Sequence, residues 1–409
     1  MSNKVINEQT MTDIADAIRE KLEISDKFHP SEMPGAIHRI KGGIAEWERP
    51  SEWPNLDSLD LSDYEDVFVI TLDNTKKDAW FSVKANTSAG SGTIILFEQG
   101  TVIDGEFVLE KTWWGTKGST YRCYIESQYD YPVIMVSSPV YTMTSFGYDS
   151  APSISGQTGM GGSLMPVLEL RAKINNVSNI TSNKIANYNT QHIVIENMTK
   201  VTSLASAFAN CYSLQKIEFK NCDTKAVTNM SSTFQYCYSL YDFSFLDDFD
   251  TSSCVNMTAF LMACAGLTEF DASRLDFSSC TNISSFLSGC YNLKSASFKG
   301  TDLSKVTTIA SLFQNCYKLE NIDLSDVDLT QVTTMSNTFG TVNALRDVKL
   351  SPVSVAFSLS TQCISKETLI GIIDVLPEVD GLTLTLGNNK QKLTTEEKQP
   401  LLDKGWKIA

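Results

Sequence analysis

One arrangement of apolar residues recurs through the second half of the chain. The stretch Met230–Leu240 reads MSSTFQYCYSL, in which Phe234 lies three residues before Cys237 and Leu240 three residues after it. Closely similar stretches, LASAFANCYSL, ISSFLSGCYNL and IASLFQNCYKL, occur at other positions. Four versions of one pattern in one chain indicate an internal repeat.

The repeat places equivalent residues 26 or 27 positions apart. Apolar residues recur seven and three positions before the cysteine, and this i, i+4, i+7 spacing predicts one buried stripe of a short helix. The cysteine column is Cys211, Cys237, Cys264, Cys290 and Cys316, closed by Val342; the column three residues earlier is Phe208, Phe234, Leu261, Leu287, Phe313 and Phe339; the column seven residues earlier is Leu204, Met230, Met257, Ile283, Ile309 and Met335.

Alternating apolar residues follow each cysteine and predict a strand, because period two is the strand period. A unit of this size cannot seal a core alone, so we expect the units to stack as a solenoid with a parallel sheet along one side. The alternating pairs include Ile217 with Phe219, Phe243 with Phe245, and Ile322 with Leu324.

The cysteines of the repeat are interpreted as small buried hydrophobes. Valine replaces the column cysteine at Val342, and ten residues before the column Val227 and Val306 alternate with Cys254 and Cys280. The rival hypothesis is a ladder of disulfides or metal ligands, but the chain has no CxxC pair. Free buried thiols also suit assembly in a cytosol.

The repeat units resemble a known family. VTNMSSTFQYCYSLYDFSF and VTTIASLFQNCYKLENIDLSDVDL are similar to the leucine-rich-type repeats of BspA-like bacterial surface proteins and of mycoplasma lipoproteins, over roughly residues 190–351. The resemblance implies a curved scaffold used for adhesion or protein contact. We therefore predict an α/β leucine-rich-repeat-like solenoid over residues 166–351.

Residues 352–409 are predicted to form an α/β cap on the last coil. The pattern indicates helix, strand, helix, strand, with Ser365 and Thr394 or Thr395 as N-caps and Pro377 ending the first helix. The ending, LTLTLG through DKGWKIA, resembles the C-terminal cap of BspA-like and phage repeat proteins.

Three further regions precede the repeat. Residues 1–45 predict two short amphipathic helices, which either pack on each other or on the next domain, or form an attachment or oligomerisation module. TDIADAIREK and SDKFHPSEMPGAIHRI within them are similar to an N-terminal segment of tail and fibre-associated proteins of phages that infect Gram-positive hosts. Residues 46–144 read as an all-β sandwich, and residues 145–165, rich in Gly and Ser, as a flexible linker.

Aromatic residues supply the candidate ligand-binding positions. Trp80, Trp113 and Trp114 lie in predicted strands of the sandwich, where an exposed indole could stack on a sugar; packing in the core or at a subunit interface is the favoured interpretation. Directly after the cysteine column, the tyrosines form either a binding ridge or packing between coils; they are Tyr212, Tyr238, Tyr291 and Tyr317.

Charge and composition limit the classes of partner that the protein is expected to bind. The 33 Lys and Arg against 48 Asp and Glu give a net charge of −15, which disfavours nucleic acid and anionic lipid. No apolar run is long enough to span a membrane, and the polar start lacks the apolar core of a secretory signal. We expect a protein that is made in a cytosol and is not inserted in a membrane.

Candidate catalytic residues are few. The chain has three histidines, His29, His38 and His192, and no GxSxG, HExxH or phosphate-loop pattern. Two acidic clusters, 247–250 and 323–328, lack EF-hand spacing and are interpreted as solvated faces. We predict no cofactor and no metal.

Polar residues flank the apolar ones in the predicted strands and form an open, mostly acidic face. It includes Lys216 and Glu218, Asp242 and Ser244, Glu269 and Asp271, and Asn321 and Asp323.

Together these features favour a non-enzymatic phage tail or receptor-binding protein. It would be homotrimeric, would join other tail or baseplate proteins through residues 1–45, and would bind a glycan or protein receptor on the host. As a component of the virion tail assembled in the host cytoplasm, it would leave the cell by lysis. The alternatives are a BspA-like bacterial surface or interaction protein and, less favoured, a glycan-degrading tail enzyme with a carboxylate pair.

Overall fold

The computed structural model shows a chain built mostly of β-strands and turns. It describes residues 48–72, 79–87, 94–116, 120–124, 127–137, 143–148, 163–164, 167–177, 180 and 189–409. Within these residues two α-helices occur, α3 (Lys366–Val375) and α4 (Thr395–Asp403). The described part of the chain is therefore β-rich, with few helices. The predicted helical module 1–45 and most of the predicted 145–165 linker lie outside the described residues.

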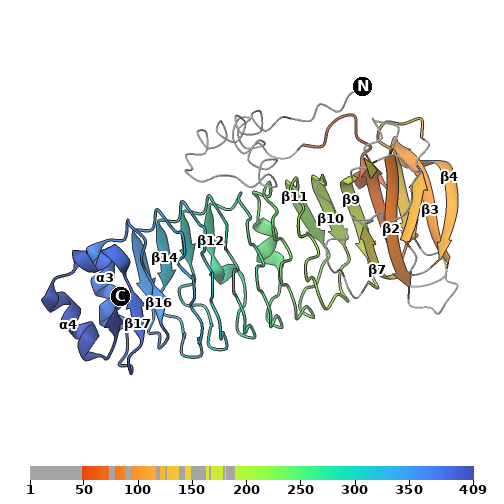
Figure 1. The fold of residues 1–409 in the computed structure, drawn as a ribbon. Coiled ribbons are helices and arrows are strands. Elements are labelled where there is room, and N and C mark those ends of the chain that lie inside the picture. Colours follow the sequence, from red (N-terminus) through yellow and green to blue (C-terminus); the bar gives the residue numbers. More distant parts are fainter. Residues whose placement is uncertain are drawn as a thin grey trace, which may run out of the picture.

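Antiparallel strands occupy the end of the molecule opposite to α3 and α4 (Figure 1). They belong to two sheets and agree with the strands predicted between residues 46 and 144. In one sheet are β1 (Asp66–Leu72), β3 (Ile94–Ile103), β4 (Glu106–Thr116) and β6 (Val133–Ser137); in the other are β2 (Ala79–Thr87), β5 (Thr120–Tyr124) and β7 (Met143–Tyr148), with the short β8 (Ser163–Leu164) paired to β2.

The first of these sheets continues into the repeats. Strand β9 (Val167–Ile174) pairs antiparallel with β1 on one side and parallel with β10 (His192–Glu196) on the other. With β11 (Lys216–Lys220), the seven-stranded order is β11-β10-β9-β1-β6-β3-β4. One hydrophobic cluster runs from Phe68 to Trp406. A flexible joint is predicted here, but the shared backbone hydrogen bonds tie the two regions directly.

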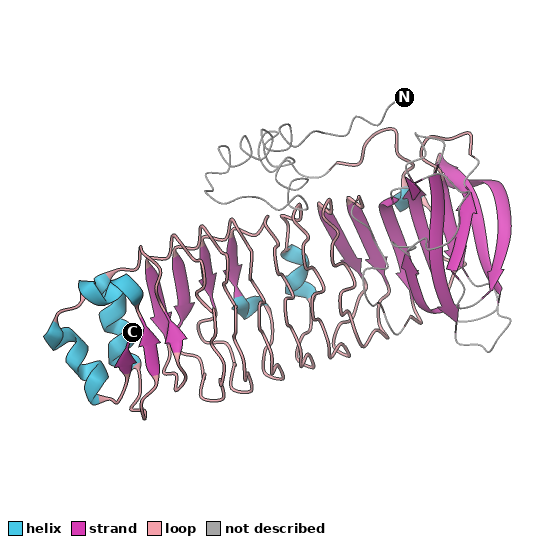
Figure 2. Cartoon of the chain, viewed as in Figure 1, coloured by secondary structure: helices cyan, strands magenta, loops and turns pink. Residues whose placement is uncertain are grey.

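Further parallel strands stack in register beyond β11 (Figure 2). They are β12 (Glu269–Asp271), β13 (Ser295–Ser297), β14 (Asn321–Leu324) and β15 (Asp347–Leu350). A second ladder of isolated bridges joins the same coils through Ser203, Asn229, Asn256, Asn282, Thr308 and Thr334. Residues one repeat apart therefore lie side by side throughout.

One predicted strand is absent. Around Phe243 and Phe245 the chain forms a 3-10 helix, η3 (Ser244–Asp248), and the Asp242 carboxylate accepts a hydrogen bond from the Ser244 amide. The spacing from Cys237 to Cys264 is 27 residues rather than 26. The additional residue fits a 3-10 turn, which locally replaces the ladder.

The short helix predicted in each repeat is wrong. Residues 204–211 form turns in which Ser206 and Asn210 have positive φ angles of 56° and 64°. The amides of Ser206, Phe208 and Asn210 donate to carbonyls of the next coil, whereas the amides between them donate three residues back. An α-helix would keep these bonds within one segment. The pair of positive φ angles recurs at Ser232 and Tyr236, Ala259 and Ala263, Ser285 and Gly289, Ser311 and Asn315, and Asn337 and Thr341.

The predicted order helix, strand, helix, strand is confirmed at the C-terminal end. The elements are β16 (Phe357–Ser358), α3, β17 (Thr383–Thr385), the 3-10 helix η5 (Gly387–Lys392), α4 and β18 (Lys407–Ile408). Ser365 caps α3, and Thr394 forms a capping box with Glu397 at the start of α4. Helix α3 is joined to the last coil because the Thr368 hydroxyl lies 2.9 Å from an Asp347 carboxylate oxygen.

Candidate functional site

The outward side chains of the stacked strands form two rows, which we call the polar face. Alternate residues point into the core, as the buried Phe270 and Ile322 do, so their neighbours point outward. The first row is Glu169, His192, Lys216, Glu269, Ser295, Asn321 and Asp347; the second row is Arg171, Val194, Glu218, Asp271, Ser297, Asp323 and Lys349.

The segment 48–62 covers the polar face over β9 to β11. Arg49 binds Glu169 with its Nε 3.1 Å from both carboxylate oxygens and Nη2 2.5 Å from Oε1. Nη1 of Arg171 lies 2.6 Å from the Leu56 carbonyl and 2.8 Å from that of Leu59. The 3-10 helix η2 (Leu56–Ser58) belongs to this segment. Segment 48–62 thus occupies this end of the polar face.

His192 is buried beneath that segment, with 1% of its surface exposed. Its Nδ1 lies 2.7 Å from Glu169 and its Nε2 2.9 Å from Glu218. Burial alone would lower the pKa of His192, but the hydrogen bonds to these two carboxylates outweigh it and raise the pKa. Hydrogen bonding to His192, opposed by burial and assisted by Lys216, lowers the pKa of Glu218 to about 2. The two carboxylates therefore favour the protonated form of the ring.

Over β12 to β15 the polar face opens into a groove of about 590 Å³. Ser295 and Ser297 supply the β13 positions, and their small side chains leave a hollow between the longer residues of β12 and β14. Arg274 stands at one edge, where its Nε lies 2.5 Å from Asp247 and its Nη2 2.7 Å from the Phe243 carbonyl. This edge is consequently fixed in place.

The groove is acidic. Glu269, Asp271, Asp323 and Asp347 line it, against the cations Arg274 and Lys349. Burial would raise the pKa of Asp323, but hydrogen bonds from Ser325 and the nearby Lys349 lower it. Glu269 is exposed and makes no ion pair with the described residues. The groove can therefore attract a cationic group.

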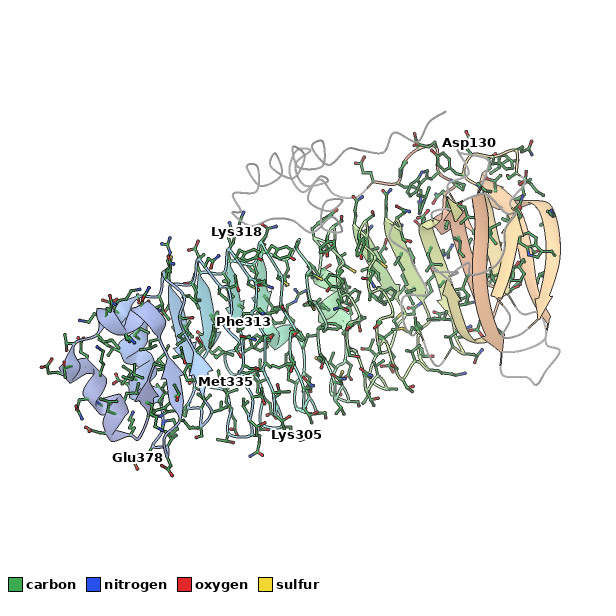
Figure 3. The ribbon with its side chains drawn as sticks, viewed as in Figure 1. Asp130, Lys305, Phe313, Lys318, Met335 and Glu378 are labelled. Carbon is green, nitrogen blue, oxygen red and sulfur yellow. The ribbon has the colours of Figure 1, made fainter. Side chains whose placement is uncertain are left out.

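The tyrosine column contains two pairs of rings in contact. The rings of Tyr212 and Tyr238 lie 5.3 Å apart, and those of Tyr291 and Tyr317 lie 5.4 Å apart and nearly parallel. Ala265 interrupts the column, and Tyr238 is only 3% exposed. Figure 3 shows Lys318, which follows Tyr317 in the sequence, at one edge of the stacked coils and Lys305 at the opposite edge. Tyr212 and Tyr291 also pack against a cluster that contains Tyr238 and Ala265, so these contacts support packing between coils.

The three candidate tryptophans do not share a sheet. Trp80 lies on β2, paired with Tyr124, whereas Trp113 and Trp114 lie on β4 in the other sheet. The Trp113 indole stacks on Phe97 at 5.5 Å and is half-buried. The side chains of Trp80 and Trp114 lie outside the described residues. Packing therefore accounts for Trp113.

The cysteine column is a ladder of buried free thiols, with Phe208, Phe234 and Phe313 packed fully buried in the same core. Burial raises the pKa of the Cys290 thiol to about 12. From the second cysteine onward, the thiol donates a hydrogen bond of 3.1 to 3.2 Å to the preceding coil: Cys237 to Phe208, Cys264 to Phe234, Cys290 to Leu261 and Cys316 to Leu287. The column is structural.

The acidic clusters serve turns and surface ion pairs. Asp250 and Asp328 cap the following turn through Ser252 and Thr330, and Asp326 lies 3.7 Å from Lys299. In the described part of the chain no group of three His, Cys, Asp or Glu residues is arranged to hold a metal. Across the same residues, no helix has the length and apolar character needed to cross a membrane.

The sequence predicts polar residues at both ends of the face, including Lys216 and Glu218 of β11, but it does not predict that segment 48–62 covers one end. Glu269, Asp271, Asn321 and Asp323 were expected on an open face. The contact of Arg49 with Glu169 joins residues 120 positions apart, and no local pattern predicts it.

One known family matches part of the chain. Residues 168–298 and 238–351 match the family described as "Mycoplasma protein of unknown function, DUF285". These residues include β9 to β15 and hence the whole polar face. No curated protein matches the chain.

Proposed function

We propose that this protein is a non-enzymatic structural and adhesion component of a phage tail or phage-like particle. It would bind the bacterial surface through the polar face of its coils, which we interpret as a BspA-like leucine-rich-type solenoid capped by residues 352–409. The observation that carries the proposal is the acidic groove over β12 to β15. A rigid, repeated surface of this kind suits recognition by many weak contacts.

The chemistry of the described residues favours binding over catalysis. His192 is buried and its two ring nitrogens are engaged by Glu169 and Glu218, so it is not available to a substrate. In the groove, Asp323 is engaged by Ser325 and Lys349. These contacts fix the orientation of both side chains, which suits a binding surface.

The second candidate is a bacterial surface or interaction protein with BspA-like repeats. The match of residues 168–351 to a family described from Mycoplasma favours it, while the resemblance of residues 1–45 to phage proteins favours the tail. Antibodies against the protein would label purified virions by electron microscopy if it is a tail component. Labelling of bacterial envelopes in the absence of phage would support the second candidate.

Self-association through the sandwich belongs to the proposal. Strand β4 is at the edge of its sheet, and Ile103, Val108 and Leu109 of the β3–β4 hairpin are 39% to 53% exposed. Exposed apolar residues on an edge strand favour contact with another chain. We expect a homotrimer by light scattering, and a monomeric mass would refute it.

Binding to whole cells tests the function. Fluorescently labelled full-length protein is mixed with a panel of Gram-positive strains, and bound fluorescence is measured by flow cytometry. We expect saturable binding to some strains, with no oligosaccharide released from their cell walls. Release of oligosaccharide would favour the glycan-degrading alternative, and absence of binding to every strain would contradict the adhesion proposal.

A further inference from the structure

The polar face is occupied at one end and open at the other. Over β9 to β11 the segment 48–62 lies across it, and over β12 to β15 the groove of about 590 Å³ is uncovered by described residues. Glu169 pairs through His192 with Lys216, and Lys216 and Glu269 each lie five residues after a column cysteine, so Glu169 and Glu269 occupy equivalent positions in the first row. The covered end therefore shows how this face binds a peptide.

The covered end binds its segment through charge and backbone contacts. The guanidinium of Arg49 holds Glu169, and the same side chain lies 2.7 Å from Asp57. Cations of β9 bind carbonyls of the segment: Arg171 of the second row binds Leu56 and Leu59, and Lys173, two residues further along the strand, lies 2.9 Å from the Leu61 carbonyl. The open end has the same kinds of charged side chain: Glu269 takes the place of Glu169, and Lys349 is the cation of the second row.

We propose that the groove binds an extended peptide segment of a partner protein that carries arginine or lysine side chains. This inference rests on the proposed recognition function and names the chemistry of its partner. Cationic side chains would pair with the exposed carboxylates of Glu269 and Asp347 at the two ends of the first row. Lys349 and Arg274 would face backbone carbonyls, as Arg171 does at the covered end.

Other ligand classes fit the groove less well. Four carboxylates against two cations disfavour anionic polymers. A neutral glycan would gain most from an exposed aromatic platform, but Phe270, the aromatic residue of the lining, is 4% exposed. A peptide with basic side chains complements the acidic charge of the groove and does not need an exposed aromatic residue.

Strand spacing sets the length of the peptide. Glu269 and Asp347 are three strands apart in one row, a distance of roughly 14 Å at about 4.8 Å per strand. An extended peptide rises roughly 3.3 Å per residue, so two arginines four positions apart reach both carboxylates. The probe is the fluorescein-labelled peptide Gly-Ser-Arg-Ser-Ser-Ser-Arg-Ser-Gly.

Fluorescence anisotropy with the full-length protein tests the inference. We expect saturable binding that Glu269→Gln combined with Asp347→Asn weakens at least about tenfold, because truncating charge pairs at an interface removes most of their attraction. The control Glu378→Gln changes an exposed carboxylate at the C-terminal end of the molecule (Figure 3) and should leave binding unchanged. Replacing both arginines of the probe by neutral citrulline should also weaken binding at least about tenfold.

Three results would overturn the inference: no saturable binding, equal binding of the citrulline peptide, or equal weakening by the Glu378→Gln control. Cell binding by the same variants separates it from the proposed function. If the double variant loses cell binding although the peptide does not bind, recognition by the groove stands and the peptide class is wrong. If neutral cell-wall oligosaccharides then displace the protein from cells, the ligand is a glycan.

Discussion

At the residue scale, the cysteine column shows how far pattern reasoning reaches. Replacement of cysteine by Val342 in the same column predicts buried, unpaired thiols, and Cys237, Cys264 and Cys290 are fully buried and free. The hydrogen bonds from these thiols to carbonyls of the preceding coil were not predictable, because they depend on backbone positions between coils.

Removing one thiol should cost stability. We expect Cys237→Ala to lower the free energy of unfolding by about 1 to 2 kcal/mol, since it leaves a small cavity and removes the bond to Phe208. Urea unfolding of the variant measures the loss. The exposed Cys363→Ala is the matched control and should change stability by less than about 0.5 kcal/mol; similar losses in both would show that the column does not carry the packing assigned to it.

The buried histidine predicts a pH dependence. The pKa of His192 is raised in the folded protein, so its stabilisation is complete below about pH 6.5 and is lost as the pH rises through the folded pKa. We expect His192→Gln to cost about 1.5 to 3 kcal/mol near pH 6 and progressively less at alkaline pH. Melting temperatures of both proteins from pH 5 to 9 test this, and a constant difference would contradict it.

At the element scale, the periodicity of the repeat was interpreted correctly as a buried stripe and wrongly as a helix. Leu204, Phe208 and Cys211 are all fully buried. Their spacing is shared by a helix and by the turns observed, in which every second amide donates to the next coil. The sequence of one coil does not reveal hydrogen bonds made to another coil. The turns also lack a sequence signal, because most of their residues with positive φ are not glycine.

The C-terminal elements depend on one glycine. Gly405 precedes β18 with φ of 81°, and a Cβ there would lie 2.0 Å from the Val379 carbonyl oxygen. We expect Gly405→Ala to destabilise the protein by about 2 kcal/mol or more. Gly371→Ala in α3 is the matched control, since nothing lies within 4 Å of its added Cβ, and it should stabilise by about 0.5 to 1 kcal/mol. Thermal unfolding distinguishes them, and equal effects would refute the prediction.

At the scale of the whole molecule, the strands predicted between residues 46 and 144 and the polar face were predictable, but their continuity was not. Strand β9 joins β1 to β10, and segment 48–62 reaches across three coil strands. The pairing of β1 with β9 and the contact of segment 48–62 with β9 link residues about 100 or more positions apart. Local sequence patterns do not predict contacts of this kind.

Equal coils predict tolerance to the loss of a whole repeat. Deleting residues 281–306 joins Cys280 to Thr307, which occupies the position of Thr281 in the next coil. We expect this variant to fold cooperatively, because the columns remain aligned. Deleting residues 281–293, half a coil, should abolish cooperative thermal unfolding by circular dichroism. Folding of both, or of neither, would contradict stacking in register.

The most direct test of the central claim, recognition through the polar face, is carboxylate footprinting of the full-length protein with and without cell walls from a strain that it binds. Carbodiimide labelling read by mass spectrometry reports the accessibility of Glu269 and Asp347, both exposed in the free protein. Bound cell wall should reduce the labelling of both residues and leave the labelling of Glu378 unchanged. Protection confined to Glu106 and its neighbours in the β3–β4 hairpin would contradict it.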